Sequence, residues 1–418
     1  MFTTRPEILG TFGAVTSTHW LASAAGMAML ERGGNAFDAA VAAGFVLQVV
    51  EPHLNGPGGE VPILLYAAGE DRVRVLCGQG VSPAAATVER YLAEGVTLVP
   101  GTGLLAAVVP GAVDAWLSML RDYGTMALAD VLEPAIHYAA AGHPLLPRVS
   151  ATIGTVRDLF LEHWPTSAAT WLPGGETPEG RRLFRNPTLA ETYRRLAAEA
   201  AGAPSREAGI DRARDAFYRG FVAEAIDRFC RTQKVMDVSG ERHGGLLTAD
   251  DLAGWRATYE APLTYDYCGY TVCKTGPWGQ GPVFLQQLAL LKGFDVAAMD
   301  PTGPDFVHTV VECMKLAFAD REAYYGDPDF AEVPMAALLD EGYNAERRAL
   351  IGPEASLELR PGRIPGFEER AERAVPGMAG KAAGKPGAGA GEPTMAHLGE
   401  RRGDTCHVDV IDRWGNMV

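Results

Sequence analysis

Apolar positions near the N-terminus follow a helical spacing in two successive segments. In residues 20–29 they recur every three or four positions, and Gly33-Gly34 then supplies the left-handed conformation that commonly ends a helix. Asn35 is a good N-cap for the next helix, with Asp38 in the position of the reciprocal capping partner. Residues 36–50 are apolar on nearly every face, so this second helix is predicted to be buried.

Strand and helix patterns alternate along much of the remaining chain, which predicts an α/β fold. The segments 61–67 and 72–76 have the short apolar runs and flanking turn residues of strands. Thr248 and Asp251 repeat the capping-box pattern at the start of another helix. The further elements predicted are a strand over 265–274 and long helices over 282–293 and 305–325.

The composition changes abruptly towards the C-terminus. Residues 373–404 are dominated by Gly, Ala, Pro and Lys, which cannot bury enough apolar surface to offset their ordering entropy, so a flexible linker is predicted. A strand over Thr405–Ile411, a turn at 412–416 and a return strand from Met417 follow. The chain then stops within a hairpin, which leaves strand edges open, so we expect a truncated protein. The predicted divisions are 1–372, 373–404 and 405–418.

Composition and charge narrow the functional classes. Apolar residues make up 47% of the 418 residues and the net charge is −15, so a sizeable core is expected and binding to nucleic acid or anionic membrane is disfavoured. The cysteines form no C-x-x-C pair, the N-terminus has no signal-peptide pattern, and no apolar run reaches the roughly 20 residues of a membrane span. We expect a soluble, cytoplasmic protein with free thiols.

Common cofactor and metal motifs are missing. The nine histidines include no i, i+4 pair, so we expect no zinc site. Residues 101–106 have the spacing G-x-G-x-x-A, but Pro100 and Pro110 interrupt the strand and helix that a dinucleotide site needs. A plain turn is predicted there instead.

Thr405 is the residue whose setting suggests chemistry. It follows the linker and Gly403-Asp404, so its hydroxyl could attack the carbonyl of Asp404 and make Thr405 a new N-terminus. The freed α-amine, with a reference pKa of about 7.7, would suit a general base at neutral pH. Two alternatives stay open at this point: β-branched residues commonly open strands, and Cys406 is a competing nucleophile.

Several blocks of the sequence resemble the large subunit of γ-glutamyltranspeptidases, also called glutathione hydrolases. In the family's order they are GGNAFDAAVAAGFVLQVVEPHLNGPGGE, VVPGAVDAW, YGTM, GGLLTADDLAGW and FADREAYYGDPDF. These blocks lie within about residues 13–334, and GDTCHVDVIDRWGNMV is similar to the family's cleavage-site block. The resemblance implies an N-terminal-nucleophile hydrolase with an αββα sandwich, made as a precursor that cuts itself into two subunits.

The resemblance also assigns site residues. The family's cleavage block has threonine, threonine and histidine, and the matching run here is Thr405, Cys406 and His407. Thr405 is therefore implied to be the nucleophile, and the bond between Asp404 and Thr405 the cleavage site. No metal or organic cofactor is implied. The implied partners are a small-molecule amide substrate and the small subunit, most of which is missing from this chain, so the sandwich is expected to be incomplete and this chain alone inactive.

The resemblance departs from the family at the donor site. Matching Ser82-Pro83 to the family's Ala-Pro puts Gln79 where γ-glutamyl-specific members carry an arginine that binds the donor carboxylate. Replacing a charge-assisted contact by a neutral amide costs about 1.5–3 kcal/mol, or one to two powers of ten in affinity. The alternative is that Gln79 only shapes its loop.

The resulting hypothesis is a self-processing N-terminal-threonine amidohydrolase or acyltransferase that cleaves γ-glutamyl or related small amides through a covalent acyl-enzyme. Within the enzyme class, an acylase or amidase without γ-glutamyl specificity is the competing reading. In a different class, the chain would be a non-processing, inactive scaffold or binding protein of the same fold.

Overall fold

The computed structural model describes residues 9–374 and 405–418, which form two compact units. The first unit contains described residues 9–72, 76–259 and 405–418, and the second contains residues 73–75 and 260–374. Nothing in the sequence pattern predicts this division. In the described ranges, no helix combines the length and apolar character that a bilayer crossing requires.

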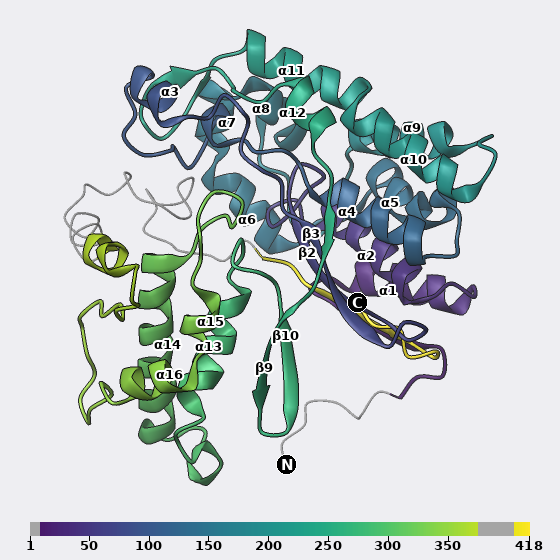
Figure 1. The fold of residues 1–418 in the computed structure, drawn as a ribbon. Coiled ribbons are helices and arrows are strands. Elements are labelled where there is room, and N and C mark those ends of the chain that lie inside the picture. Colours follow the sequence, from purple (N-terminus) through teal and green to yellow (C-terminus); the bar gives the residue numbers. More distant parts are fainter. Residues whose placement is uncertain (1–8, 375–404) are drawn as a thin grey trace. The chain divides into compact units, whose positions relative to one another are not determined.

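The first unit combines many helices with short strands (Figure 1). Its helices are α1 (Trp20–Glu31), α2 (Ala36–Val50), α3 (Val88–Ala93), α4 (Ala112–Tyr123), α5 (Leu128–Ala141), α6 (Pro147–Thr155), α7 (Arg157–His163), α8 (Pro165–Trp171), α9 (Pro187–Ala200), α10 (Arg206–Tyr218), α11 (Phe221–Thr232) and α12 (Ala249–Gly254). Short 3-10 turns lie at Leu104–Ala106 and Pro173–Gly175. The first of these occupies the G-x-G-x-x-A segment and confirms the predicted turn.

The strands of the chain pair in small groups. They are β1 (Gly13–Ser17), β2 (Val61–Ala67), β3 (Arg72–Gly78), β4 (His143–Pro144), β5 (Leu183–Phe184), β6 (Val235–Met236), β7 (Arg242–His243), β8 (Thr258–Glu260), β9 (Leu263–Tyr267), β10 (Tyr270–Lys274) and β11 (Val408–Asp412). The strand orders are β1-β11, β2-β3-β8, β4-β5, β6-β7 and β10-β9.

The two N-terminal helices form as their sequence predicts. The side chain of Asn35 accepts from the backbone N–H of Asp38, whose carboxylate accepts in return from the backbone of Asn35, so α2 begins with a capping box. Gly33 follows α1 with φ of +93°, in the left-handed conformation. Every residue of α2 is buried. Such a helix must lie inside the unit, where it contacts α1, α4, α5 and β11.

Small side chains on α2 let its neighbours approach closely. A Cβ added to Gly44 would lie 2.6 Å from the indole of Trp116 on α4, so only glycine leaves room for that ring. Buried side chains of α1, α2, α4, α5, α9 and α10 form one core with the inward residues of β2 and β11. Figure 1 shows α1, α2, α4 and α5 gathered on one side of the strands.

The C-terminal hairpin pairs with strands from the N-terminal part of this unit. β11 pairs antiparallel with β1, from Gly13 opposite Asp412 to Ser17 opposite Val408. After the turn, Met417 bridges both Ile411 of β11 and Tyr66 of β2, so the return segment lies between two strands. The predicted turn is confirmed, and the return segment pairs through isolated bridges at Met417.

The second unit is built on a hairpin and helices. β9 and β10 pair antiparallel, with α13 (Gly281–Leu291), α14 (Pro304–Tyr324), α15 (Met335–Leu338) and α16 (Glu341–Arg348) following and a short 3-10 turn at Val296–Ala298. The expected single strand over 265–274 is therefore wrong. Cys268 and Gly269 take φ of +51° and +85°, which turns the chain back on itself. Asp320 and Arg347 form a buried ion pair at 3.1 Å between α14 and α16.

Candidate active site

Thr405, the predicted nucleophile, lies just outside the strand ladder. The expected strand from Thr405 is wrong by three residues, since β11 begins at Val408. The reason lies in the partner strand: after Ser17, the backbone N–H of Thr18 donates to the carbonyl of His407 at 3.2 Å, and α1 then begins at Trp20. β1 therefore offers no further residues to pair with the chain at Thr405.

The two candidate nucleophiles differ in exposure. Thr405 is exposed, whereas Cys406 is half-buried and packs against the core. Burial, with a further contribution from the charge of Glu51, raises the pKa of the Cys406 thiol to about 11. A thiol with this pKa is protonated at neutral pH and a poor nucleophile, which counts against Cys406 as the alternative. Thr405 stays the predicted nucleophile. Asp404 and the bond that joins it to Thr405 lie outside the described residues.

The strand that follows Thr405 is fixed from several directions. Val410 and Val418 exchange backbone hydrogen bonds of 3.0 Å, and Met417 does the same with Tyr66 at 2.9 Å. The carboxylate of Asp412, 4% exposed, accepts from the backbone N–H of Ala36 at 2.9 Å, at the start of α2. The hairpin is thus tied to the most buried helix of the unit, which gives the segment before it a rigid base.

A buried carboxylate lies near the nucleophile segment. Glu51 ends α2 and is 4% exposed, and its Oε2 accepts a hydrogen bond from the Thr18 hydroxyl. Burial raises the pKa of Glu51 above its ordinary value, while the Thr18 hydrogen bond and the charge of Arg148 act in the opposite direction. Sequence reasoning missed Glu51 and Thr18. The available signal was an acid directly after a helix whose only strongly polar residues are Asp38 and Gln48.

Gln79, the predicted substrate-binding residue, follows directly after β3 and is half-buried. Its loop is held by close backbone packing, because a Cβ on Gly80 would lie 1.6 Å from the carbonyl oxygen of Val109. The N–H of Val109 also donates to Val81 at 3.0 Å. Among the described residues, no hydrogen bond joins Gln79 to Thr405, and the contacts described for the loop are those with Val109.

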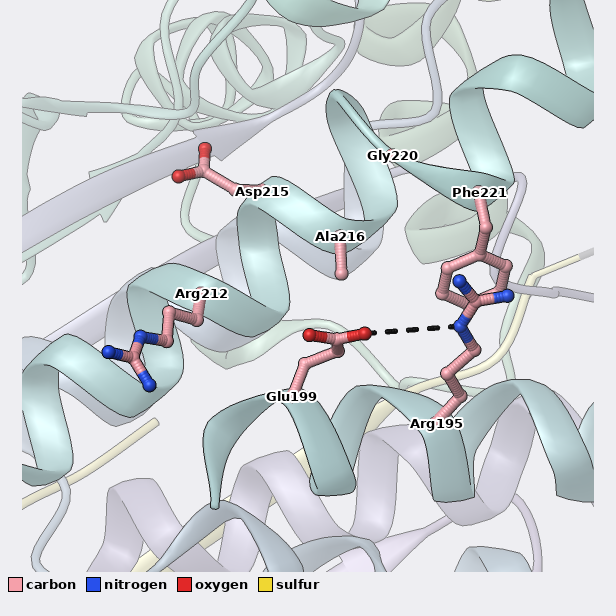
Figure 2. A pocket seen from close by; sticks show the side chains of 7 residues that line it. All are labelled: Arg195, Glu199, Arg212, Asp215, Ala216, Gly220 and Phe221. Atoms are coloured by element: carbon pink, nitrogen blue, oxygen red, sulfur yellow. Dashed lines mark ion pairs between the residues drawn. The ribbon is translucent and has the colours of Figure 1, made fainter. Parts of the chain in front are cut away.

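A surface hollow of about 310 Å³ lies over α9, α10 and the start of α11 (Figure 2). Its side chains are engaged with one another: the Arg195 guanidinium lies 3.9 Å from the centre of the Phe221 ring and 4.0 Å from the Glu199 carboxylate. Asp215 pairs with Arg256 at 3.2 Å. Neither Thr405 nor Gln79 lines this hollow, and we do not assign it to the active site.

The structure therefore has a mixed α/β fold, in which the exposed Thr405 precedes the anchored strand β11. The chain belongs to the gamma-glutamyltranspeptidase family, whose model matches residues 22–418. The family predicted from the sequence is thereby confirmed.

Individual relatives carry different names. The chain is 34% identical to the glutathione hydrolase-like YwrD proenzyme of Bacillus subtilis, over 85% of this chain and 63% of that protein. It is 33% identical to the acylase ACY 1 proenzyme of a Pseudomonas species, over 98% of this chain and 64% of that protein. The solved structure of LmbA2991HD is 55% identical with a TM-score of 0.85, covering all of this chain and 68% of its own. The chain thus spans just under two thirds of the two curated relatives.

Proposed function

We propose that this chain is the large-subunit region and the first part of the small subunit of a self-processing amidohydrolase or acyltransferase, with Thr405 as its nucleophile. The observation that carries the proposal is the exposed Thr405, three residues ahead of a strand anchored on both sides, in a chain that matches the family through residue 418. The divisions 1–372, 373–404 and 405–418 belong to this proposal, and most of the linker lies outside the described residues. The proposal also includes the completion of an αββα sandwich by further small-subunit sequence.

Self-cleavage requires one acyl transfer and one hydrolysis. The Thr405 hydroxyl oxygen attacks the carbonyl carbon of Asp404, the C–N bond between the two residues breaks, and the hydroxyl proton passes to the departing nitrogen. Water then hydrolyses the ester, which releases the Asp404 carboxylate and restores the hydroxyl beside a free α-amine. Neither step uses a metal or an organic cofactor.

Turnover reuses the same hydroxyl. The α-amine of Thr405 takes the hydroxyl proton as the oxygen attacks the substrate amide, and the leaving amine receives that proton as the acyl-enzyme forms. Water or an amine acceptor then releases the acyl group. The substrate class is a γ-glutamyl compound or a related small amide, and the uncharged Gln79 favours amides other than γ-glutamyl donors.

Intact-mass analysis of the protein expressed from its gene, with any sequence that follows Val418, tests the proposal. The expected result is two fragments that meet between Asp404 and Thr405. Thr405→Ala should abolish cleavage and amidase activity, whereas Thr405→Ser, which keeps a hydroxyl, should retain measurable cleavage. A folded wild-type protein that stays whole would overturn the proposal in favour of the non-processing scaffold.

A further inference from the structure

A chain of hydrogen bonds links a buried acid to the nucleophile segment. The Glu51 carboxylate accepts from the Thr18 hydroxyl, and the backbone N–H of the same threonine donates to the carbonyl of His407 at 3.2 Å. His407 lies two residues after Thr405. In the described part of the chain, this Thr18–His407 bond is the last backbone hydrogen bond before Thr405 is reached. Whatever fixes Thr18 therefore also fixes the main chain from which the nucleophile extends.

Glu51, the acid in this series of hydrogen bonds, is buried, and burial disfavours its charged form. A folded-state pKa above the ordinary value means that Glu51 contributes most to stability below that ordinary value, and that this contribution is lost as pH rises through the folded pKa. Besides Thr18, the groups that act on or respond to this carboxylate are Arg148 and the Cys406 thiol, and Arg148 also acts on His53. A buried acid with a raised pKa and a specific polar partner is typical of functional sites.

We infer that Glu51 is a positioning residue of the self-processing reaction, which through Thr18 fixes the backbone at His407 and with it the approach of the Thr405 hydroxyl to the scissile bond. The inference rests on the proposed function of Thr405. Attack on the preceding carbonyl needs a defined backbone geometry, and small displacements of a reacting group cost large factors in rate. Glu51 itself does not contact the reacting atoms in this role.

Three substitutions separate this role from simple structural support. Glu51→Gln keeps an oxygen acceptor and removes the charge. Thr18→Val keeps the shape and the backbone donor but removes the hydroxyl, and Thr18→Ser restores a hydroxyl. Glu31→Gln, which changes an exposed acid at the end of α1, serves as the matched control. All are made in the protein expressed from its gene with any sequence beyond Val418.

The readouts are the rate at which the new N-terminus at Thr405 appears, followed by intact mass, and the melting temperature at pH 7.5. We expect Thr18→Val, which removes the hydrogen bond to Glu51, to slow processing by about tenfold or more, the factor for losing a hydrogen bond to a charged group. Glu51→Gln keeps an acceptor but removes its charge, and it should slow processing by about fivefold, the difference between a charged and a neutral acceptor. Thr18→Ser and Glu31→Gln should process within about threefold of wild type. Glu51→Gln should melt no lower than wild type.

Each contrary outcome has a distinct meaning. Wild-type rates in both Glu51→Gln and Thr18→Val would overturn the positioning role and leave the nucleophile assignment intact. A slower Glu51→Gln protein that also melts well below wild type would assign Glu51 to structural support alone. A folded wild-type protein that remains uncut would overturn the proposed function and this inference together.

Discussion

The anchor at Asp412 allows a stability prediction worked from the structure. Its carboxylate accepts four hydrogen bonds of 2.9–3.0 Å: from the backbone N–H groups of Ala36, Trp414 and Asn416, and from the Asn416 side chain. Asp412→Ala leaves the buried N–H of Ala36 without an acceptor, at about 1–3 kcal/mol. The loss of negative charge at the start of α2 adds about 0.3–1 kcal/mol. The N–H donors of the turn lie nearer solvent and form hydrogen bonds with water instead, so we expect a total loss of about 1.3–4 kcal/mol.

Thermal unfolding of the wild-type and variant chains, followed by circular dichroism and calorimetry, measures this loss. Because two units are present, agreement between the probes must be checked before a free energy is extracted. The expected decrease in melting temperature is roughly 4–10 °C. Asp412→Asn keeps one acceptor oxygen and should lose about half as much.

Asp409→Asn is the matched control for this prediction. Asp409 lies on the same strand but is exposed, and its carboxylate accepts only from His407 among the hydrogen bonds described. Its replacement should change stability by no more than about 0.5 kcal/mol. A loss below about 1 kcal/mol in Asp412→Ala, or an equal loss in Asp409→Asn, would refute the reasoning that burial and the link to α2 make this carboxylate important.

Three further predictions concern the site and its surroundings. Gln79→Arg should raise kcat/KM for γ-glutamyl-p-nitroanilide about 10–100-fold relative to a simple acyl anilide, and an unchanged ratio would show that this position only shapes the loop. Cys406→Ala should leave self-cleavage and amidase rates near wild type, since burial raises the pKa of the thiol to about 11; a large loss of both would transfer the chemistry to the thiol. Burial, helped by His143, lowers the pKa of His19 from 6.5 to about 4, so the unfolded chain binds more protons between these values and stability should fall as pH drops through them. Melting temperatures at pH 7.5 and 5 check this, and His19→Asn, which keeps a capping acceptor for α1, should show a smaller fall.

Most of the correct sequence predictions depend on residues that are close together in the sequence. Two capping boxes, at Asn35 with Asp38 and at Thr248 with Asp251, form as expected because each depends on residues only three positions apart. The burial of α2 follows from an apolar surface on nearly every side, which is unfavourable in contact with water. The family resemblance added the predictions that Thr405 is the nucleophile and Gln79 the donor position, which spacing alone left open and which stay predictions.

Most errors and omissions of the sequence predictions arise where contacts between distant parts of the chain determine the structure. The start of β11 depends on where β1 ends, because a strand extends only as far as its partner. The turn at Cys268 requires a left-handed conformation that cysteine rarely adopts, and only the adjacent Gly269 hinted at it. Glu51 gained its significance from Thr18, which lies far away in sequence and meets it only in the folded chain.

The proposed chemistry gives a physical reason why β11 begins at Val408 and leaves Thr405 outside the strand ladder. A residue within an antiparallel ladder has its N–H and C=O groups committed to a neighbour, so its hydroxyl cannot easily be turned on the carbonyl that precedes it. Thr405 and Cys406 lie outside the ladder, whereas Val410 and Asp412 are fixed to the rest of the unit. Freedom at the scissile bond without a fixed base would spread Thr405 over many orientations and lose the advantage of proximity. On the proposed function, the hydrogen bond from Thr18 to His407 lies at the junction between these two parts, and the buried carboxylate of Glu51 holds Thr18 in place there.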